Sequence, residues 1–232
     1  MPKRRCNPCW LRRDIMAEKK TIALFGATGP TGKYIIEEAL KRGYALAVYT
    51  REAKKLEAFA GKVEIVVGDL KDRDAIAKCI ESADAVISAL GPNGAKAQID
   101  RPVMHGLANI ISVMKQSSVR RLIQISTASY RDSKDGFDIK ARALALMFKV
   151  IARKSYDDIK STGELIANSD LDWTLVRIPF LKNDPANGQV EVGSYGRTKL
   201  GMKLSRGNLA KFLVDQVADE TFVRAAPGIA NG

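Results

Sequence analysis

Three short stretches of the sequence place a lysine four residues after a tyrosine: YRDSK at 130–134, YDDIK at 156–160 and YGRTK at 195–199. On a helix this spacing puts the phenol and the ammonium group on one face, about one turn apart. The nearby cation favours the phenolate and lowers the pKa of the tyrosine, which suits proton transfer to a carbonyl oxygen. The sequence therefore offers three candidate proton donors, and the elements that position them decide which one can serve a site.

The segments that would position such a pair alternate between short apolar runs and helical patterns. Buried strands are predicted at 21–26, 44–50, 63–68, 84–90, 120–126, 172–179 and 221–226. Helices are predicted at 30–43, 100–117, 156–169 and 206–218. Asp100 is the expected N-cap of the second of these helices. Strands that alternate with helices predict an α/β fold, with a doubly wound, mostly parallel sheet and right-handed crossovers.

One domain is expected at residues 20–232, with a small C-terminal portion on the substrate side. Residues 1–15 are interpreted as a disordered or mis-assigned extension, because they precede Met16 and hold five Lys or Arg against one acid, +4 of the net charge of +12. Their CNPC motif lacks the second half of a zinc site, so no metal site is expected. The remaining positive charge is spread along the chain without a nucleic-acid reading element, so no nucleic-acid partner is expected.

The composition is that of a globular protein, with 46% hydrophobic and 28% charged residues. No uninterrupted apolar run approaches the length of about 18 residues that a membrane-spanning helix needs, so no membrane partner is expected. The three cysteines are an odd number and give no disulfide framework. A reducing, cytoplasmic setting is therefore predicted.

A glycine-rich turn, GATGPTG, follows the first predicted strand and opens the first predicted helix. Glycines spaced three apart can make the tight turn, let the backbone approach a pyrophosphate and allow close helix–strand packing. The dipole and free N–H groups of the helix start favour an anion, and two threonines add hydroxyl donors. The pyrophosphate-binding candidates are Gly26, Thr28, Gly29, Pro30, Thr31 and Gly32.

The end of the second predicted strand indicates which dinucleotide binds. NAD sites commonly place an acid there against the ribose hydroxyls, whereas NADP sites place an arginine against the 2′-phosphate. Thr50 occupies the acid position, Arg51 follows it, and Lys55 lies nearby. The sequence therefore favours NADP(H) over NAD(H), although Glu52 opposes this choice and Arg51 equally fits a solvated loop residue.

Further motifs follow the later strands: TRE at 50–52, GDL at 68–70, SALG at 88–91, IST at 125–127 and LDWTLVRIP at 171–179. Together with the glycine-rich turn, this series resembles the atypical short-chain dehydrogenase/reductases with a Rossmann sheet, specifically the NmrA-like and flavin reductase/biliverdin reductase B-like members. The resemblance implies that Asp69 and Leu70 flank the adenine and that Ala89, Leu90 and Gly91 line the path of the nicotinamide ribose. It also implies that Ser126 and Thr127 lie beside the nicotinamide, and that Pro179 and Phe180 close over its amide.

The same resemblance favours YDDIK among the three candidate pairs, because this superfamily keeps its Tyr and Lys on the helix before the sixth strand. The predicted catalytic residues are Ser126, Tyr156 and Lys160. The long gap between Ser126 and Tyr156 equally fits a tyrosine that is not essential, with solvent supplying the proton. Lys160 and Glu164 equally fit a surface ion pair.

The predicted function is that of an NADPH-dependent oxidoreductase that transfers hydride to a flavin, a quinone or a small carbonyl acceptor. The alternative is a non-catalytic, NmrA-like NADP(H) sensor that acts through a protein partner. Residues 137–154 are expected on the substrate side, where their apolar side chains line a pocket or pack on the core or a partner subunit. The single histidine, His105, is interpreted as a surface or interface residue.

Overall fold

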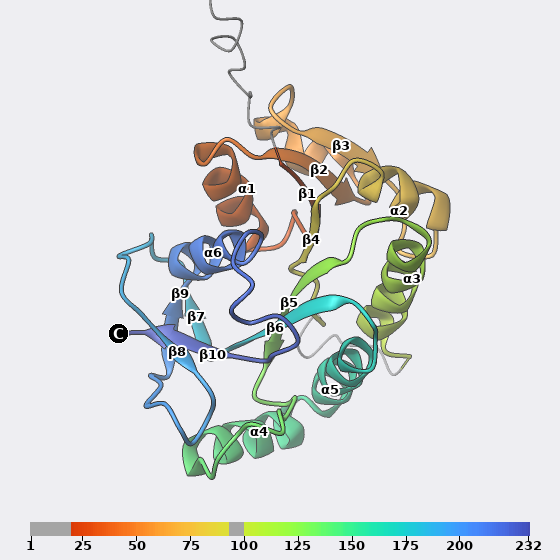
Figure 1. Cartoon of the computed structure of the whole chain (residues 1–232). Helices are drawn as coiled ribbons and strands as arrows, with labels where there is room; N and C mark the ends of the chain where they lie inside the picture. The colour runs from red at the N-terminus through yellow and green to blue at the C-terminus, as the bar shows by residue number, and fades with distance from the viewer. Residues whose placement is uncertain (1–19, 93–99) are drawn as a thin grey trace, which may run out of the picture.

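The computed structural model describes residues 20–92 and 100–232, so the predicted extension at 1–15 lies outside the described residues. Within the described residues the central sheet has eight strands in the order β3-β2-β1-β4-β5-β6-β10-β8 (Figure 1). Their bounds are β1 Thr21–Phe25, β2 Ala45–Thr50, β3 Glu64–Val67, β4 Ala85–Ser88, β5 Arg121–Thr127, β6 Asp172–Ile178, β8 Val190–Gly193 and β10 Gly228–Asn231. All neighbouring strands run parallel except β8, which is antiparallel to β10. The prediction of a doubly wound, mostly parallel sheet is confirmed.

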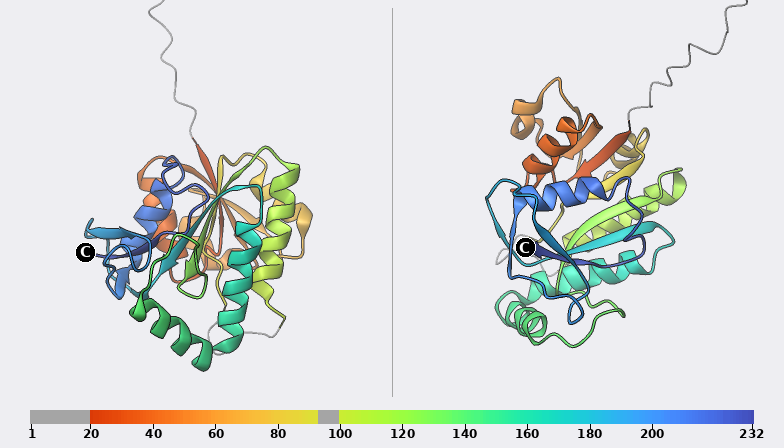
Figure 2. Two further views of the ribbon diagram at one scale, coloured as in Figure 1. Left: turned by 60° about the horizontal axis from the view of Figure 1, so that its bottom comes forward. Right: turned by 60° about the vertical axis from the view of Figure 1, so that its left-hand side comes forward.

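Helices cover both faces of this sheet. Their bounds are α1 Gly32–Lys41, α2 Arg73–Ile80, α3 Pro102–Gln116, α4 Ile139–Ile151, α5 Arg153–Ala167 and α6 Arg206–Asp215, with a 3-10 helix η1 at Ala53–Phe59. Helices α1 and α6 share one apolar core with one face of the sheet, whereas α2, α3 and α5 share a second core with the other face (Figures 1 and 2). A separate two-stranded sheet pairs β7 (Phe180–Lys182) with β9 (Lys203–Ser205).

The amphipathic pattern of the sequence explains why α1 packs as it does. Ile35, Ile36 and Ala39 lie on one helical stripe and are buried against the sheet. Gly43 follows the helix with a φ of +81°, in the left-handed region that a glycine reaches without steric cost. The predicted stop of this helix is therefore confirmed.

The start of α3 differs from the prediction. The N-cap is Arg101, with a φ of 50°, rather than Asp100. The carboxylate of Asp158, which is fully buried on α5, instead accepts the N–H groups of Val103 at 3.2 Å and Met104 at 2.9 Å. The acid that satisfies the helix start thus comes from another helix, which a local sequence pattern does not reveal.

The strand predicted at 221–226 is wrong. These residues form turns, with a single bridge between Thr174 and Ala225, and the last strand is β10. Arg224 has a φ of +52°, which interrupts an extended chain at the point where the apolar pattern predicts one.

Helix α4 is packed differently from the others. None of its residues, all of which the structure describes, is buried, and the helix lies at one end of the molecule (Figure 1). Its N-cap is regular, since the Asp138 carboxylate accepts the N–H of Ala141 at 3.0 Å. Among the described residues, no helix combines the length and the hydropathy that crossing a bilayer requires.

Candidate functional site

The glycine-rich turn has the predicted geometry at the carboxyl end of β1. Gly26 adopts a φ of +80°, and its carbonyl accepts the N–H of Gly29 at 3.1 Å. A Cβ on Gly26 would lie 2.7 Å from the carbonyl carbon of Ala89, and one on Gly32 would lie 2.1 Å from the carbonyl oxygen of Ala27. These two positions therefore require glycine for the fold itself, since a larger residue would overlap backbone atoms.

Gly29 has a different environment in the same turn. A Cβ there would meet only the carbonyl oxygen of Gly26, at 3.2 Å. Thr28 and Pro30 are exposed beside it, whereas Thr31 is buried at the start of α1. The outer side of the turn is thus open, next to a helix start whose first N–H groups have no intrahelical partners. This geometry suits an anion such as a pyrophosphate.

The end of β2 carries the predicted cations. The Thr50 hydroxyl accepts the N–H of Glu52 at 3.1 Å, which shapes the turn after the strand. Lys55 Nζ donates to Glu52 Oε1 at 2.7 Å, and this hydrogen bond lowers the pKa of the Glu52 carboxyl, with further help from the charges of Lys55 and Arg51. Within the described residues Arg51 is exposed and forms no salt bridge, so its guanidinium is available to a ligand phosphate.

The turn after β3 holds Asp69 and Leu70 in place. Tyr49 donates its hydroxyl to the carbonyl of Asp69 at 2.8 Å, and burial raises the pKa of this tyrosine to about 12. The Asp69 carboxylate accepts the N–H of Lys71 at 3.0 Å, while the Leu70 carbonyl accepts the side-chain amide of Asn109 at 2.8 Å. These bonds fix the turn next to the β2 end, where the resemblance expects the adenine.

A cavity of about 220 Å³, here named the central cavity, lies at the carboxyl ends of β4 and β5. It brings together six of the predicted residues: Thr31, Ala89, Leu90, Gly91, Ser126 and Thr127. Side chains from α3, α4, α5 and β6 complete its wall. Sequence segments that are far apart thus meet where a doubly wound sheet binds its ligands.

Three buried polar atoms of the central cavity lack a hydrogen-bond partner among the described residues: Gln124 Oε1, Ser126 Oγ and Thr162 Oγ1. The other end of the Gln124 amide is engaged, since Nε2 donates to the carbonyls of Leu90 at 3.0 Å and Ile125 at 2.6 Å. An unpaired buried polar atom costs about 1–3 kcal/mol. The three residues that carry these atoms all line the central cavity, which makes its wall the part of the described structure best suited to a polar ligand.

A second cavity, here named the apolar cavity, has a volume of about 170 Å³ and adjoins the first. The two cavities share Thr127, Phe148 and Ile178. Pro179 and Phe180 lie on the apolar cavity, and Phe180 is 54% exposed. The segment expected to close over the amide therefore lines the neighbouring space instead of the central cavity.

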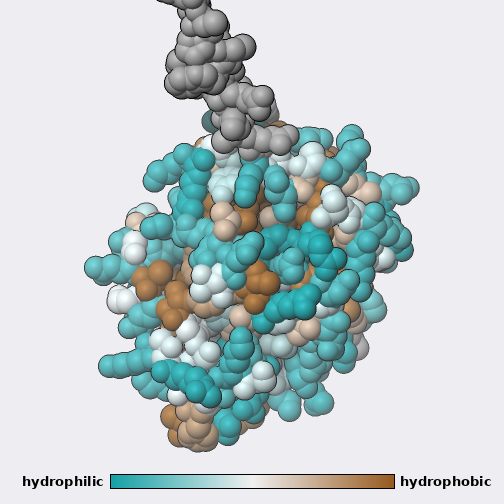
Figure 3. All heavy atoms as spheres, in the orientation of Figure 1, coloured by the Kyte–Doolittle hydropathy of each residue, from teal (hydrophilic) through white to brown (hydrophobic). Residues whose placement is uncertain are grey.

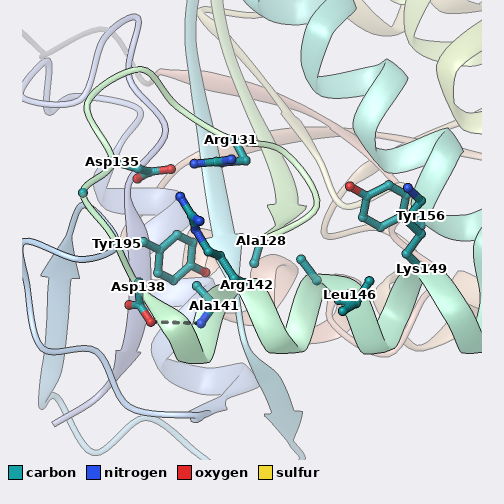
Figure 4. A pocket seen from close by; sticks show the side chains of 12 residues that line it. Ala128, Arg131, Asp135, Asp138, Ala141, Arg142, Leu146, Lys149, Tyr156 and Tyr195 are labelled. Atoms are coloured by element: carbon teal, nitrogen blue, oxygen red, sulfur yellow. Dashed lines mark hydrogen bonds between the residues drawn. The ribbon is translucent and has the colours of Figure 1, made fainter.

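A third cavity, here named the basic cavity, has a volume of about 240 Å³ and lies between α4 and the loop that follows β5 (Figure 4). Three exposed cations line it, Arg131, Arg142 and Lys149, and two carboxylates that are already hydrogen-bonded, Asp135 and Asp138, complete its charged lining. Tyr156 lies on this cavity, with Lys149 Nζ 5.8 Å from the centre of its ring. It does not line the central cavity with Ser126.

Lys160 is also placed away from the central cavity. Its Nζ lies 3.5 Å from Glu164 Oε1, and both side chains are about half exposed. This is the surface ion pair that the sequence left open as an alternative. The structure thus brings Ser126 together with the cofactor candidates, but it does not bring Tyr156 and Lys160 to them.

The other two tyrosines of the Tyr-x-x-x-Lys motifs have raised rather than lowered pKa values. Burial raises the pKa of Tyr130, which packs against Gly163 of α5. Burial also raises the pKa of Tyr195 to about 12, and the Arg177 guanidinium lies 4.5 Å above its ring. Neither is suited to acid catalysis near neutral pH. His105 is exposed on α3, as predicted.

A buried ion pair behind the basic cavity is not evident from the sequence. Arg177 on β6 is fully buried and donates two hydrogen bonds to the Asp135 carboxylate, at 2.5 and 2.7 Å. Asp132 in the same loop accepts the N–H of Ala226 at 2.9 Å. Together these contacts hold the loop between β5 and α4 on the sheet.

A family of proteins described as NAD(P)H-binding matches residues 26–220 of this sequence. The chain belongs to this NAD(P)H-binding family. The match begins at the first glycine of the GATGPTG turn and includes the central cavity.

Similar proteins include plant reductases. The chain is 24% identical to the isoflavone reductase homolog A622 of Nicotiana glauca over 216 residues, which are 88% of this chain and 66% of that protein. It is 41% identical to the phenylcoumaran benzylic ether reductase Pyrc5 of Pyrus communis over 85 residues, 33% of this chain and 28% of that protein. The chain thus covers less than two thirds of the length of either relative.

Solved structures share the fold. A short-chain dehydrogenase/reductase of Veillonella parvula has a TM-score of 0.74 at 20% identity, covering 92% of this chain and 94% of that one. A structure of a short-chain dehydrogenase/reductase from the same organism in complex with NADP has a TM-score of 0.72 at 20% identity, with 91% and 94% coverage. These structures confirm the Rossmann-like fold that the sequence motifs indicated, and the family match confirms that the chain belongs to an NAD(P)H-binding family.

Two residues of the central cavity were missed by sequence reasoning. Gln124 interrupts the apolar run of β5, and this break in a buried strand was an available signal. Thr162 stands within the polar pattern of α5, so nothing in the local sequence distinguishes it from a surface residue. Only the packing of α5 on the sheet shows that both contribute to one site.

Proposed function

We propose that this chain is an NADPH-dependent oxidoreductase that reduces a flavin, a quinone or a small carbonyl compound by hydride transfer. The observation that carries the proposal is the set of unpaired polar atoms of Gln124, Ser126 and Thr162 in the central cavity. Gln124 and Ser126 belong to β5 and Thr162 to α5, and the cavity that they line adjoins an apolar cavity that offers space for an acceptor. Membership of an NAD(P)H-binding family and plant relatives named as reductases support it.

The protein's own residues explain how a dinucleotide would be held. The open side of the turn at Gly29 and the N-terminus of α1 suit the pyrophosphate. Arg51, exposed after β2, suits a 2′-phosphate, with Lys55 partly engaged by Glu52. We therefore favour NADP(H) over NAD(H). Asp69 and Leu70 mark the adenine side of the same edge.

The central cavity fits a nicotinamide because a carboxamide both donates and accepts hydrogen bonds. Gln124 Oε1 can accept from its amino group, whereas the hydroxyls of Ser126 and Thr162 can donate to its carbonyl oxygen. When bound, a reduced nicotinamide supplies a hydride, that is, two electrons with one hydrogen. The protein contributes the orientation of the ring towards the wall that the two cavities share.

The acceptor is placed in the apolar cavity. The wall shared by the two cavities includes the side chains of Thr127 and Phe148, so an acceptor ring there lies next to the central cavity. Ser126 and Thr127 are in a position to orient it. An acceptor bound there would gain the hydride together with one proton. Solvent supplies the proton, since Tyr156 and Lys160 lie outside the central cavity and remain at most an optional acid.

The test is NADPH oxidation, followed by the absorbance of the reduced nicotinamide, with NADH in parallel and FMN, a benzoquinone and an aldehyde as acceptors. We expect turnover with NADPH, and a Ser126→Ala variant with about five- to tenfold weaker NADPH binding because it loses one hydrogen bond. Ser133→Ala is the matched control, since Ser133 is exposed in the loop before α4. NADPH binding without turnover on any acceptor would contradict the proposal that the chain is an oxidoreductase.

A non-catalytic NADP(H) sensor is the second candidate. The placement of Tyr156 outside the central cavity, with Lys160 paired to Glu164, favours it. A sensor would bind NADPH and NADP⁺ with different affinities and change its affinity for a protein partner. The same titrations distinguish the two, because a sensor keeps the Ser126→Ala binding defect without any acceptor reduction.

A further inference from the structure

Helix α4 exposes an apolar surface that the rest of the molecule does not cover. Five large apolar side chains in and before the helix are between 62% and 77% exposed: Phe137, Ile139, Leu146, Val150 and Ile151. In the space-filling view, hydrophobic residues gather at the lower end of the molecule, where α4 lies (Figure 3). Apolar residues scattered singly over a surface are ordinary, but a group on one helix marks a binding surface.

The periodicity of α4 separates this surface from the apolar cavity, although Leu146 of the surface also borders the basic cavity. Leu144, Ala145 and Phe148 line the apolar cavity and therefore face the protein. Ile139, Leu146 and Val150 are spaced by seven and four residues, which places them together on the opposite, outward face. The outward stripe thus lies on the face of α4 opposite to Leu144, Ala145 and Phe148, which line the cavity proposed for the acceptor.

Cations border the outward stripe, and acids are absent from it. Residues 139–156 contain five positive charges and no Asp or Glu: Lys140, Arg142, Lys149, Arg153 and Lys154. At about 100° per residue, Lys140 lies on one flank of the stripe, while Arg142 and Lys149 lie on the other. The view of the basic cavity shows these last two on the side of α4 that faces the loop (Figure 4).

We propose that α4 docks on an anionic lipid surface, with its outward stripe in the interface and its cations against the headgroups. A helix with a broad apolar face and Lys or Arg beside it is typical of proteins that lie on a membrane surface. A second copy of the chain fits less well, because pairing the stripe with itself would bring five positive charges against five. The proposal departs from the expectation of no membrane partner, which rested on the lack of a spanning segment; a helix on the surface needs none.

At about 100° per residue, Met147 lies on α4 between the outward stripe and the residues that line the apolar cavity. Met147 and Phe180 both line that cavity, and they are 43% and 54% exposed. Docking through α4 therefore brings the mouth of the cavity to the lipid surface. A lipid-soluble ring compound then reaches the cavity without crossing water, whether or not the chain reduces it.

The experiment measures binding of the full chain to vesicles by flotation, with phosphatidylcholine alone or mixed with phosphatidylglycerol. The first fifteen residues carry a net charge of +4 and attract anionic vesicles by themselves, so the decisive comparison is between variants. We expect Leu146→Glu/Val150→Glu to lower binding to the anionic vesicles at least tenfold. Val67→Glu is the matched control, because Val67 is 54% exposed on β3, at the other end of the sheet. It should bind as the unaltered chain does.

Variants that remove single positive charges test whether the cations contact the lipid headgroups. Lys149→Gln and Arg153→Gln should each weaken anionic-vesicle binding about fivefold, and salt should reduce the difference. Lys62→Gln, a change at an exposed lysine before β3, should leave binding unchanged. Circular dichroism should show that all these exposed variants are folded.

Two results would overturn the proposal. In one, the Leu146→Glu/Val150→Glu variant binds anionic vesicles as well as the Val67→Glu variant does. In the other, light scattering finds a dimer that these α4 substitutions dissociate, which makes the stripe an interface between copies. Neither result depends on NADPH oxidation, so the reductase proposal stands or fails separately.

Discussion

The turn between β1 and α1 and the helix α4 lie at the same edge of the sheet but are built in opposite ways. In the turn, an added Cβ on Gly26 or Gly32 would overlap backbone atoms within 2.7 Å, so the fold itself determines the residue. In α4 no residue is buried, and the helix is held at its N-terminus by the Asp138 cap and the loop before it. The turn is thus fixed by backbone packing, whereas α4, which borders the cavity proposed for the acceptor, is free to vary in sequence without loss of the core.

The largest loss of stability is expected at the buried ion pair that attaches the loop before α4 to the sheet. Arg177→Met would leave the Asp135 carboxylate buried without its cation, and breaking such a pair costs about 3–5 kcal/mol in free energy of unfolding. Urea unfolding measures the loss. Arg206→Met is the matched control, because Arg206 is only partly buried and donates a hydrogen bond to the exposed, uncharged Asn183. A similar loss in both variants would mean that the buried pair does not anchor the loop.

A smaller loss of stability, but a complete loss of cofactor binding, is expected at the turn. Gly26→Ala combines left-handed backbone strain with overlap onto Ala89, together about 2–4 kcal/mol. Gly43→Ala isolates the strain, since Gly43 has nearly the same φ of +81° and an added Cβ there meets nothing within 4 Å. Denaturant unfolding and NADPH fluorescence titration measure both variants. Equal destabilisation of the two would show that the close approach to Ala89 is not needed.

The same contrast explains which features of the fold and the site could be predicted from the sequence. The glycine spacing, the strand–helix alternation and the position of Ser126 follow from local patterns, and the structure confirms the fold and places Ser126 in the central cavity. Asp158 as the acid at the start of α3 and Thr162 in the cavity could not be predicted, because both depend on how α5 packs on other elements. The motif at 156–160 suggested a site residue, but Tyr156 stands in the first turn of α5, next to α4 and the basic cavity.

The proposed contact between Arg51 and the 2′-phosphate can be tested by removing the charge of the arginine. Arg51→Gln should weaken NADPH binding about tenfold or more and leave NADH binding within about twofold, because a hydrogen bond to a charged phosphate contributes about 1.5–3 kcal/mol. Lys54→Gln neutralises another exposed cation of the same segment and should have a smaller effect on NADPH binding. Competition binding with NADPH and NADH measures the ratio. Equal losses for both cofactors would assign Arg51 to a general electrostatic role and not to the 2′-phosphate.

The smallest effect, a change in kcat, is expected at Tyr156, which lies next to α4 in the basic cavity. Its hydroxyl belongs to the basic cavity, and Lys160 is paired with Glu164, so Tyr156→Phe should change kcat by less than about threefold. Tyr44→Phe, at a half-buried tyrosine before β2, is the matched control. General acids typically contribute about a hundredfold or more, so a loss of that size with an altered pH profile would show that Tyr156 reaches the acceptor. That outcome would require α4 and α5 to move towards the central cavity when the acceptor binds. It would make the loosely packed side of the molecule, in place of the rigid turn, the part that completes the site.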